Sequence, residues 1–346
     1  MIRWHLLVLC ALVGCTATPD PITPGDQTAP TGGVYILNEG VWGQSNASLS
    51  LYDPQSQIVQ QNLFSAANGR PLGDVGNFIL SRGPVAYIVV NGSDRIEIID
   101  AQTHRSRGTI TLAPGVSPRQ LAVVNDSVGL VTNLYDASVS VLDFRTFTEQ
   151  ARIPVGPHPE GIALASGTAF VANSGLGTGH SVSMIDLATL SAIGSLEVGE
   201  NPADVLTIDG SLVFVLCAGS YGEFSDPDDD TPATLITIDP AQRRVVDSLH
   251  IGGHAFRMAS DGASRIYVSG SAAVLRIDSG NPGIIETFVA GAYYGLGVDS
   301  ATGDVYLADA RTFVIPGEVR VFSSSGIEKG RFDAGLVPGR FAFFHQ

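Results

Sequence analysis

One phrase of sequence recurs along this chain and limits the folds open to it. The phrase is an apolar strand that ends in a small polar residue, a short turn, an alternating strand that ends in Asp, and a third strand. Its clearest copies place the final aspartates at Asp100, Asp143 and Asp186, so both intervals are 43 residues. A fixed interval of this length indicates a repeat architecture, in which one small supersecondary unit is copied along the chain.

Seven copies can be traced, and each of them has room for a fourth strand. Weaker copies begin at residues 33, 212, 265 and 304. Between successive copies lies a further short strand introduced by Pro or Gly, as at residues 117–124. A strand-only unit of four strands and about 45 residues is typical of a propeller blade, and radial closure protects the sheet edges that a linear stack would expose. A β-sandwich is the competing interpretation, but it does not predict a regular interval.

We therefore predict an all-β fold, a seven-bladed β-propeller of four-stranded blades, and the two ends of the repeat predict how the ring closes. The first copy, which starts at Gly33, lacks an introductory strand, whereas the chain ends with a surplus strand at residues 337–344. We expect Arg340 to Phe344 to lie in the same sheet as Gly33 to Asn38, which would complete blade one.

The first 32 residues have the pattern of export followed by a tether. Residues 1–14 hold one basic residue, Arg3, and then an apolar run from Leu6 to Val13, which is the order of a secretory signal. The run is well below the roughly 20 residues of a membrane-spanning helix, although an ordinary cleaved signal or a short anchor stays as an alternative. Residues 15–32 contain too few apolar side chains to offset the entropy of ordering, so we predict a flexible tether before a propeller at residues 33–346.

Three resemblances to known families add to this interpretation. Leu12-Val13-Gly14-Cys15 resembles the bacterial lipobox, which implies that Cys15 is lipidated and becomes the first mature residue. Val-Thr-Asn at 131–133 and Val-Ala-Asn at 171–173 resemble the YVTN-type propeller repeats of bacterial surface proteins. The opening residues 32–50, together with residues 64–74, are similar to propeller lipoproteins found beside TonB-dependent outer-membrane transporters, some relatives of which capture corrinoids.

The net charge disfavours some classes of partner, and the cysteine content excludes a disulfide framework. The formal net charge is -15 with a single lysine, Lys329, so phosphates would repel the body, and non-specific binding to nucleic acid or to an anionic lipid surface is disfavoured. Cys10 falls in the signal and Cys15 is the lipid site, which leaves Cys217 and therefore no disulfide framework. We expect Cys217 to be a buried apolar residue rather than a nucleophile.

Ligand-binding residues are expected around the mouth of the channel. In a propeller, the loops from the second to the third strand and the loops that precede the first strand emerge on one face, and binding residues gather on such loops. In the loops that precede the first strands we assign, at positions taken as equivalent, Arg119, Glu160, Asp204, Arg257 and Arg340, with Tyr293 and Tyr294 in a further blade. The alternative is that these charges pair with one another and merely fill the channel.

The loops between the second and third strands add polar and aromatic candidates. They are Glu39, Trp42, Asn46, Tyr135, Asp136, His180, Tyr221, Phe224, Arg311 and Phe313. Stiff rings in exposed loops give contact area at little entropic cost. Trp42 has the alternative of packing beneath its own glycine-rich loop. The recurring Asn and Asp of the repeat are expected to hydrogen-bond their local backbone instead of taking part in chemistry.

No motif indicates catalysis, a metal or a cofactor. Asp226 to Asp230 could hold Ca²⁺, but the segment lacks the spacing of an EF-hand loop, which favours a solvated acidic loop. His158, His180, His250 and His254 are scattered without a closely spaced ligand pair. Propeller enzymes nevertheless assemble sites from distant blades and leave no linear signature, so enzymatic activity stays open.

Three functions are carried forward. The leading hypothesis is a lipid-anchored protein of the bacterial outer membrane or cell surface that captures a small molecule, a corrinoid by the resemblance, and passes it to a TonB-dependent receptor. The second is a protein–protein scaffold of the cell envelope. The third is a propeller hydrolase such as a lactonase, with Glu160 and Asp204 as metal ligands.

Overall fold

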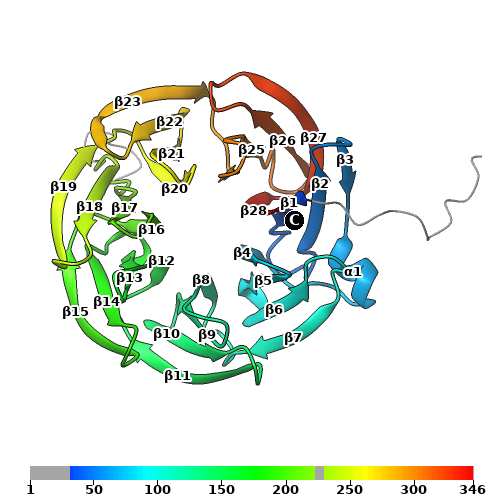
Figure 1. Ribbon diagram of the computed structural model, residues 1–346, viewed down its shortest axis with the longest axis horizontal. Helices are drawn as coiled ribbons and strands as arrows, with labels where there is room; N and C mark the ends of the chain where they lie inside the picture. Colours follow the sequence, from blue (N-terminus) through cyan, green and yellow to red (C-terminus); the bar gives the residue numbers. More distant parts are fainter. Residues whose placement is uncertain (1–31, 223–229, 346) are drawn as a thin grey trace, which may run out of the picture. The chain divides into compact units, whose positions relative to one another are not determined.

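Seven antiparallel sheets of four strands each form the part of the chain that the structure describes. The structure is a computed structural model, and it describes residues 32–222 and 230–345. Figure 1 shows the sheets as blades around a common axis, with one strand of each blade nearest the axis and another on the rim. This arrangement confirms the predicted seven-bladed β-propeller.

The blades are numbered along the chain, and the strands of each are given from the axis outward. Blade one contains β28 (Pro338–His345), β1 (Gly32–Asn38), β2 (Ser48–Asp53) and β3 (Ile58–Gln60). Blade two contains β4 (Gly76–Arg82), β5 (Val85–Val90), β6 (Arg95–Asp100) and β7 (Ser106–Thr111). Blade three contains β8 (Pro118–Val123), β9 (Val128–Asn133), β10 (Ser138–Asp143) and β11 (Thr148–Pro154). Blade four contains β12 (Pro159–Ala165), β13 (Thr168–Asn173), β14 (Ser181–Asp186) and β15 (Ser191–Glu197).

The remaining blades follow the same order. Blade five contains β16 (Pro202–Ile208), β17 (Leu212–Cys217), β18 (Thr234–Asp239) and β19 (Arg244–His250). Blade six contains β20 (Ala255–Ser260), β21 (Arg265–Gly270), β22 (Ala273–Asp278) and β23 (Asn281–Ala290). Blade seven contains β24 (Gly295–Val298), β25 (Val305–Asp309), β26 (Pro316–Phe322) and β27 (Glu328–Leu336). Short helices lie between strands: α1 (Leu63–Asn68), η1 (Asn91–Ser93) and η2 (Gly175–Gly177).

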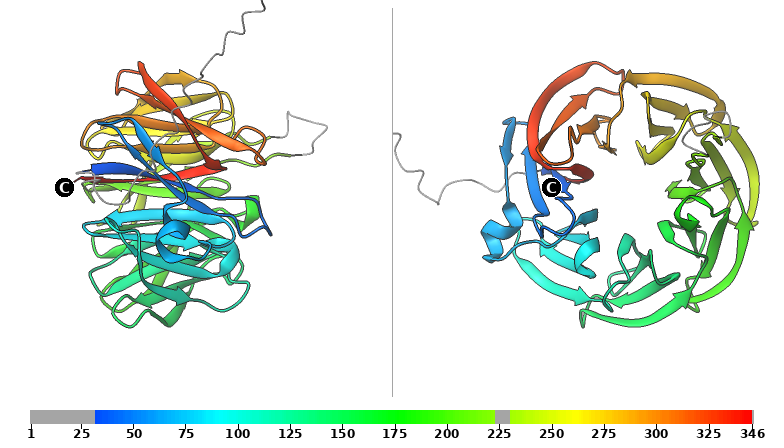
Figure 2. Two further views of the ribbon diagram at one scale, coloured as in Figure 1. Left: turned by 90° about the vertical axis from the view of Figure 1, so that its right-hand side faces the viewer. Right: turned by 180° about the vertical axis from the view of Figure 1, so that it is seen from behind.

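The C-terminal strand closes the ring, as the sequence predicts. β28 pairs antiparallel with β1, in a register that sets Arg340 opposite Leu37 and Phe344 opposite Gly33. Figure 2 shows the red C-terminal strand beside the dark blue β1. β28 also contacts the inner strands of both neighbouring blades, β24 and β4, so the circle of inner strands is continuous.

The hydrophobic core is divided into seven clusters, each lying between two adjacent blades. The cluster between blades four and five, for example, includes the fully buried Phe170 and Val215. The second strand of each blade is packed on both faces, which explains why it reads as a continuous apolar run rather than an alternating one. Each large apolar side chain buried there contributes about 1.5–3 kcal/mol. Outer strands such as β15 are mostly exposed.

The aspartates of the repeat cap turns within their own blades, as predicted. Asp100 accepts from the backbone N–H of Thr103 at 2.9 Å, and Asp186 accepts from that of Thr189 at 2.8 Å. Asp143 does the same with the N–H of Arg145 at 2.8 Å. These contacts favour the charged carboxylate, and they hold the pKa of Asp143 and Asp186 below the usual value.

The prediction for the repeated asparagines is wrong. Asn133, at the end of β9, donates through Nδ2 to the hydroxyls of Ser138 at 2.9 Å and Ser140 at 2.7 Å on β10. Asn173 makes the same pair of contacts with Ser181 and Ser183, both at 3.0 Å. The reason is burial: these asparagines are shielded from solvent and face the next strand, where a Ser-x-Ser pair supplies hydroxyl acceptors.

The structure agrees with the prediction for Cys217 but does not describe several other predicted residues. Cys217 is buried, and burial raises the pKa of its thiol to about 12, in keeping with the predicted apolar role. Cys15, Phe224 and Asp226–Asp229 lie outside the described residues. Within the described part, no helix is long and apolar enough to cross a membrane.

Candidate ligand-binding site at the channel mouth

A repeated backbone hydrogen bond brings two sets of loops to one face. In six blades, the N–H of the residue just after the second strand donates to the carbonyl of the residue just before the inner strand. Blade one has this bond from Glu39 to Val337 at 2.8 Å, and blade three has it from Leu134 to Ser117 at 3.1 Å. The others join Asn91 to Val75, Ser174 to His158, Ala218 to Asn201 and Ser271 to His254. Side chains from both loop sets therefore converge around one end of the channel.

The inner strands begin with a strained residue and a bulge. In five blades the residue before the inner strand is not glycine yet has a left-handed backbone, with φ between 50 and 57°: Val75, Ser117, His158, Asn201 and Val337. Such a conformation costs on the order of 1–3 kcal/mol per residue. The register then shifts within the first residues of six inner strands. A bulge re-aims the side chains beside it, here at the start of the channel.

The predicted charges do not occupy equivalent positions, which corrects our assumption that they do. Arg119 and Glu160 are second residues of their inner strands, whereas Asp204, Arg257 and Arg340 are third residues. The charges therefore lie at two levels along the channel. Asp204 and Arg257 are accordingly more buried than the first pair.

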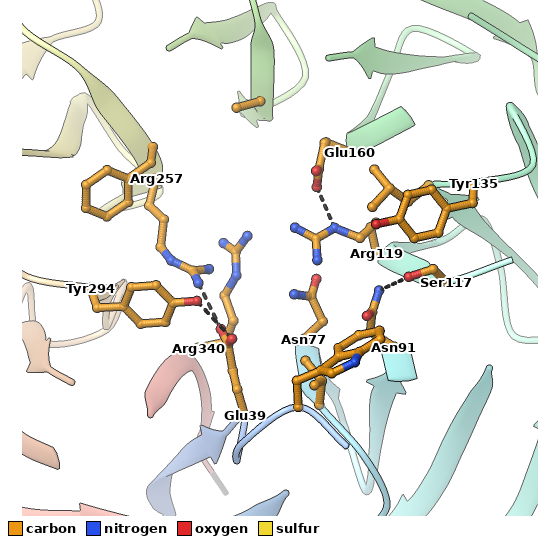
Figure 3. A pocket seen from close by; sticks show the side chains of 15 residues that line it. Glu39, Asn77, Asn91, Ser117, Arg119, Tyr135, Glu160, Arg257, Tyr294 and Arg340 are labelled. Carbon is orange, nitrogen blue, oxygen red and sulfur yellow. Dashed lines mark hydrogen bonds and ion pairs between the residues drawn. The ribbon is translucent and has the colours of Figure 1, made fainter. Parts of the chain in front are cut away.

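The two levels enclose a cavity of about 430 Å³ at the channel mouth. Figure 3 shows its polar side chains pointing inward from several blades. The lining consists of Glu39, Trp42, Val75, Asn77, Asn91, Ser117, Arg119, Leu134, Tyr135, Glu160, Ala203, Phe256, Arg257, Tyr294 and Arg340. Three arginines face two glutamates, so the lining is more basic than the strongly acidic chain as a whole.

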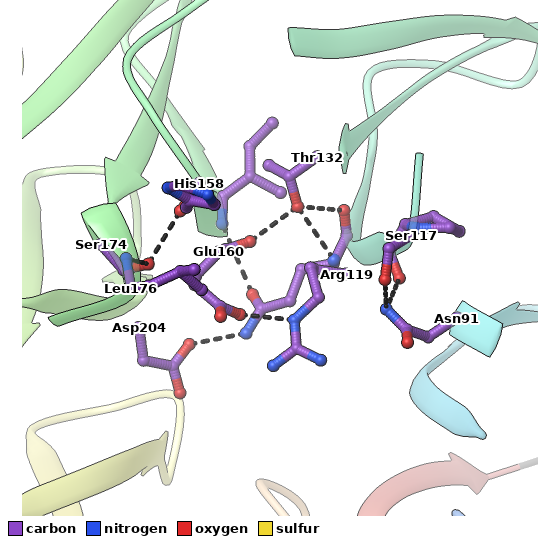
Figure 4. A network of polar contacts seen from close by, with 12 residues as sticks. Asn91, Ser117, Arg119, Thr132, His158, Glu160, Ser174, Leu176 and Asp204 are labelled. Atoms are coloured by element: carbon purple, nitrogen blue, oxygen red, sulfur yellow. Dashed lines mark hydrogen bonds and ion pairs between the residues drawn. The ribbon is translucent and has the colours of Figure 1, made fainter. Parts of the chain in front are cut away.

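On one side of the cavity, Arg119 forms hydrogen bonds with side chains of both neighbouring blades, Glu160 of blade four and Asn77 of blade two. Its Nε donates to Oε2 of Glu160 at 2.6 Å, which joins blade three to blade four (Figure 4). The amide of Asn77, oriented by its hydrogen bonds, accepts from Nη1 of Arg119 at 2.9 Å and donates to the Arg119 carbonyl at 3.1 Å. Thr132, on β9, donates to the carbonyl of Glu160 at 2.7 Å, and this bond joins blade three to the start of β12.

On the opposite side, Glu39 collects two donors from different blades. Its Oε1 accepts from Nη2 of Arg257 at 3.0 Å, and its Oε2 accepts from the hydroxyl of Tyr294 at 2.8 Å. Burial opposes the charge of Arg257, but Tyr294 and Glu39 together hold its pKa above the usual value. Glycine is required at Gly339, because a Cβ there would lie 2.2 Å from Oε1 of Glu39.

Asp204 lies near the start of β16 and does not itself line the cavity. Its Oδ1 accepts from Nε2 of Gln120 in blade three at 2.9 Å, and its Oδ2 accepts from the backbone N–H of Met258 in blade six at 3.1 Å. These contacts link blade five to blades three and six. They occupy both carboxylate oxygens of Asp204.

Arg340 is the least satisfied charge at this site. Its nearest carboxylate oxygen is Oδ2 of Asp204, at 3.7 Å from Nη1, and it makes no hydrogen bond with any described residue. Its Nε is sealed from solvent without an acceptor. Burial, and then the nearby charge of Arg257, lower the pKa of Arg340 to about 10. In Figure 3 its guanidinium projects toward the middle of the cavity.

Two aromatic side chains stand at the rim. Trp42 is 67% exposed and Tyr135 is 60% exposed, so Trp42 does not pack beneath its own loop. Tyr135 meets His158 edge to face, with ring centroids 6.2 Å apart. Exposed rings above a polar cavity provide a surface for the apolar part of a ligand.

Several predicted residues lie away from this cavity. Asp136 pairs with Arg152 at 2.8 Å, and Arg311 pairs with Asp333 at 3.0 Å. His180 is exposed. Tyr221 stacks on His254 at 3.7 Å between ring centroids, whereas Tyr293 is buried and its carbonyl accepts from the Ser269 hydroxyl. Tyr293, Arg311 and Phe313 line a neighbouring cavity of about 270 Å³, which shares Phe256 and Tyr294 with the first.

Sequence reasoning missed six lining residues apart from Ala203. They are Val75, Asn77, Asn91, Ser117, Leu134 and Phe256. Asn77 and Phe256 stand at the second position of an inner strand, as Arg119 and Glu160 do. Counting positions from the residue that starts each inner strand would have found both.

The geometry does not favour the hydrolase alternative. Glu160 is engaged by Arg119, and both oxygens of Asp204 already accept hydrogen bonds. Among the described residues, no group of three or more His, Cys, Asp or Glu side chains is placed to hold a metal ion.

Solved structures with a similar fold come from several bacteria. Hydrazine synthase of Kuenenia stuttgartiensis is 19% identical with a TM-score of 0.64, covering 77% of this chain and 88% of that chain. A quinoprotein alcohol dehydrogenase-like protein of Bacteroides thetaiotaomicron is 16% identical with a TM-score of 0.69, covering 91% and 78%. A candidate 6-phosphogluconolactonase of Bacteroides fragilis is 10% identical with a TM-score of 0.67, covering 92% and 99%. At these identities the likeness concerns the fold alone.

Sequence comparison identifies the family. No curated protein matches the chain. One family model matches residues 32–220, more than half of the 346-residue chain. That match begins at β1 and runs through the second strand of blade five, so it includes the Arg119–Glu160 side of the cavity. The chain therefore belongs to the family described as Domain of unknown function (DUF5074).

Proposed function

We propose that this protein is a ligand-capture propeller that holds a small molecule at the mouth of its channel. The observation that carries the proposal is the 430 Å³ cavity, in which the acids have partners, Arg340 has no hydrogen bond to a described residue, and two aromatic rings stand exposed above. Cavities of this size, with a few convergent polar groups, are typical of small-molecule sites.

The surroundings of the acids favour binding over catalysis. Glu39 accepts from Arg257 and Tyr294, and Glu160 accepts from Arg119. Carboxylates held in this way fix the position of the arginines that line the cavity. A pre-organised polar wall lowers the entropic cost of binding a polar ligand.

A corrinoid is the ligand to test first, since the resemblance of the opening segment implies it. A corrinoid is larger than the cavity, so it would lie across the mouth, with its broad ring against Trp42 and Tyr135 and one polar edge inserted below. Its fringe of amides would face the amides of Asn77 and Asn91.

Titration of purified protein with cyanocobalamin in a calorimeter tests this ligand. We expect saturable binding that Tyr135→Ala weakens by about 1 kcal/mol or more, as removal of an interface anchor does. Tyr221→Ala is the matched control, because Tyr221 is also an exposed ring in a loop but does not line this cavity. No heat at high micromolar protein would reject the corrinoid.

The envelope location is part of the same proposal and rests on the sequence. We propose that lipid on Cys15 anchors the chain at the bacterial surface, where it passes its ligand to a TonB-dependent receptor. Replacement of Cys15 by Ser should abolish labelling with a fatty-acid probe and release the protein from membranes. Unchanged labelling would refute lipidation at this cysteine.

One observation favours a protein partner as a second function. The loop between β25 and β26 exposes three consecutive apolar side chains, Phe313, Val314 and Ile315, at 48%, 65% and 45%. Adjacent exposed apolar residues often mark a contact surface. Val314→Asp should remove a co-purifying envelope partner without changing ligand binding, and retention of that partner would count against this surface.

A further inference from the structure

We propose that the cavity accepts an oxyanion group of its ligand, a carboxylate or a phosphate, at Arg340. This inference rests on the proposed binding function and narrows it to acidic ligands. It depends on three observations: the bonding of the cavity acids, the isolation of Arg340, and the positive charges that surround it.

None of the acids near Arg340 forms a hydrogen bond with it, because each of them has other partners. Glu39 bonds Arg257 and Tyr294, Glu160 bonds Arg119, and Asp204 accepts from Gln120 and Met258. Asp204 is the nearest acid to Arg340, but the 3.7 Å separation from Nη1 is beyond hydrogen-bond length. The guanidinium, which carries five N–H donors, has no acceptor among the described residues.

The site around Arg340 is shaped for an oxygen-rich anion. Arg340 sits one residue after the bulge of β28, which directs it toward the cavity rather than into the sheet. Arg257 and Arg119 line the same cavity, each bonded to a glutamate, so three guanidinium groups lie around one space. Guanidinium groups bind carboxylate and phosphate through paired, charge-assisted hydrogen bonds.

A buried charge without a hydrogen-bond acceptor also calls for a reason. Leaving a charged group without partners in a mostly buried position is costly, and an apolar residue of similar volume would often be neutral or stabilising there. A ligand oxyanion would supply the missing acceptors. The hydrogen bonds made in the complex would then offset the free-energy cost that the buried guanidinium imposes on the free protein.

Thermal unfolding with small anions tests the inference without the natural ligand. The probes are inorganic phosphate and glutarate, each compared with sodium chloride at equal ionic strength. We expect one or both anions to raise the unfolding midpoint of the wild-type protein in a saturable way, and we expect Arg340→Met to weaken the apparent affinity at least about tenfold. Arg311→Met is the matched control, because Arg311 is an exposed arginine that does not line the cavity.

The outcomes separate this inference from the proposed function. A rise produced by one anion alone, and lost in Arg340→Met, supports the inference and identifies the carboxylate or the phosphate. If Arg340→Met does not fold, Arg340→Gln replaces it, and we expect the same loss of the anion-induced rise in the unfolding midpoint. No rise in the wild-type protein, or an equal rise in the Arg340 variants, overturns the inference. Cyanocobalamin binding that is unchanged in Arg340→Met would also overturn it while leaving ligand capture intact.

Discussion

The polar residues of the blades and those of the channel mouth differ in where their partners lie. Asn133 and Asp186 bond within their own blades, and equivalent residues repeat the contact in other blades. Glu39 in blade one instead bonds Arg257 in blade six, and Gln120 in blade three bonds Asp204 in blade five. The repeated set shapes each blade, whereas the set that does not repeat links distant blades around a cavity. Departures from the repeat therefore indicate function better than the repeat does.

The largest effect on stability is expected at the ion pair between Glu39 and Arg257, which joins blade one to blade six. Glu39→Ala leaves the buried guanidinium of Arg257 without its carboxylate, and we expect a loss of about 3–5 kcal/mol in the free energy of unfolding. Glu39→Ala combined with Arg257→Met should recover much of that loss, because the stranded charge is gone. Urea unfolding measures both. A loss under 1 kcal/mol for the single variant would show that the pair is not a cross-ring link.

The blade asparagines should give the next largest effect. Asn133→Ala leaves two buried serine hydroxyls without their donor, and we expect a loss of about 1–3 kcal/mol in urea unfolding. Ligand binding should not change, because Asn133 does not line the cavity. Weaker cyanocobalamin binding in this variant would break the division between scaffold and site.

The turn aspartates should make the scaffold sensitive to acid. Hydrogen bonds from Arg145 and Thr189 lower the folded-state pKa of Asp143 and Asp186, so their stabilisation is present above the unfolded pKa near 3.9 and is lost as the pH falls through the lower folded value. We expect the urea midpoint to drop between about pH 5 and pH 2. Replacing both aspartates by Asn should reduce that drop, and an unchanged pH profile would contradict the assignment.

Arg340 should have the smallest effect on stability. Arg340→Met removes a guanidinium that has no hydrogen bond to a described residue, so the free energy of unfolding should change by less than about 1 kcal/mol or rise. Equilibrium urea unfolding checks this. A loss above 2 kcal/mol would mean that Arg340 belongs to the scaffold.

The ring could be predicted from sequence because its determinants are local and repeated. The aspartates at intervals of 43 residues and the surplus strand at residues 337–344 were enough to predict seven blades and their closure. The partners of the asparagines were missed because they depend on burial, which makes the Ser-x-Ser side chains better acceptors than the local backbone.

The site could be predicted only in part. The loops were identified correctly as a shared face, and eight of the fifteen lining residues were among the candidates: Glu39, Trp42, Arg119, Tyr135, Glu160, Arg257, Tyr294 and Arg340. Asn77 and Phe256 were missed because positions were not counted from the residue that starts each inner strand. The pairing of Glu39 with Arg257, 218 positions apart in sequence, is set by the circumference of the ring and has no local signal.

The central claim is that the non-repeating mouth, and not the repeated scaffold, binds the ligand. Calorimetric titration of cyanocobalamin into wild-type protein, a Trp42→Ala/Tyr135→Ala variant and the Asn133→Ala variant tests it most directly. We predict that the Asn133 variant binds like the wild type at a temperature where it is folded, and that loss of the two rim rings weakens binding by about 2 kcal/mol or more, roughly thirtyfold. Equal binding by the rim variant and the wild type would contradict the account.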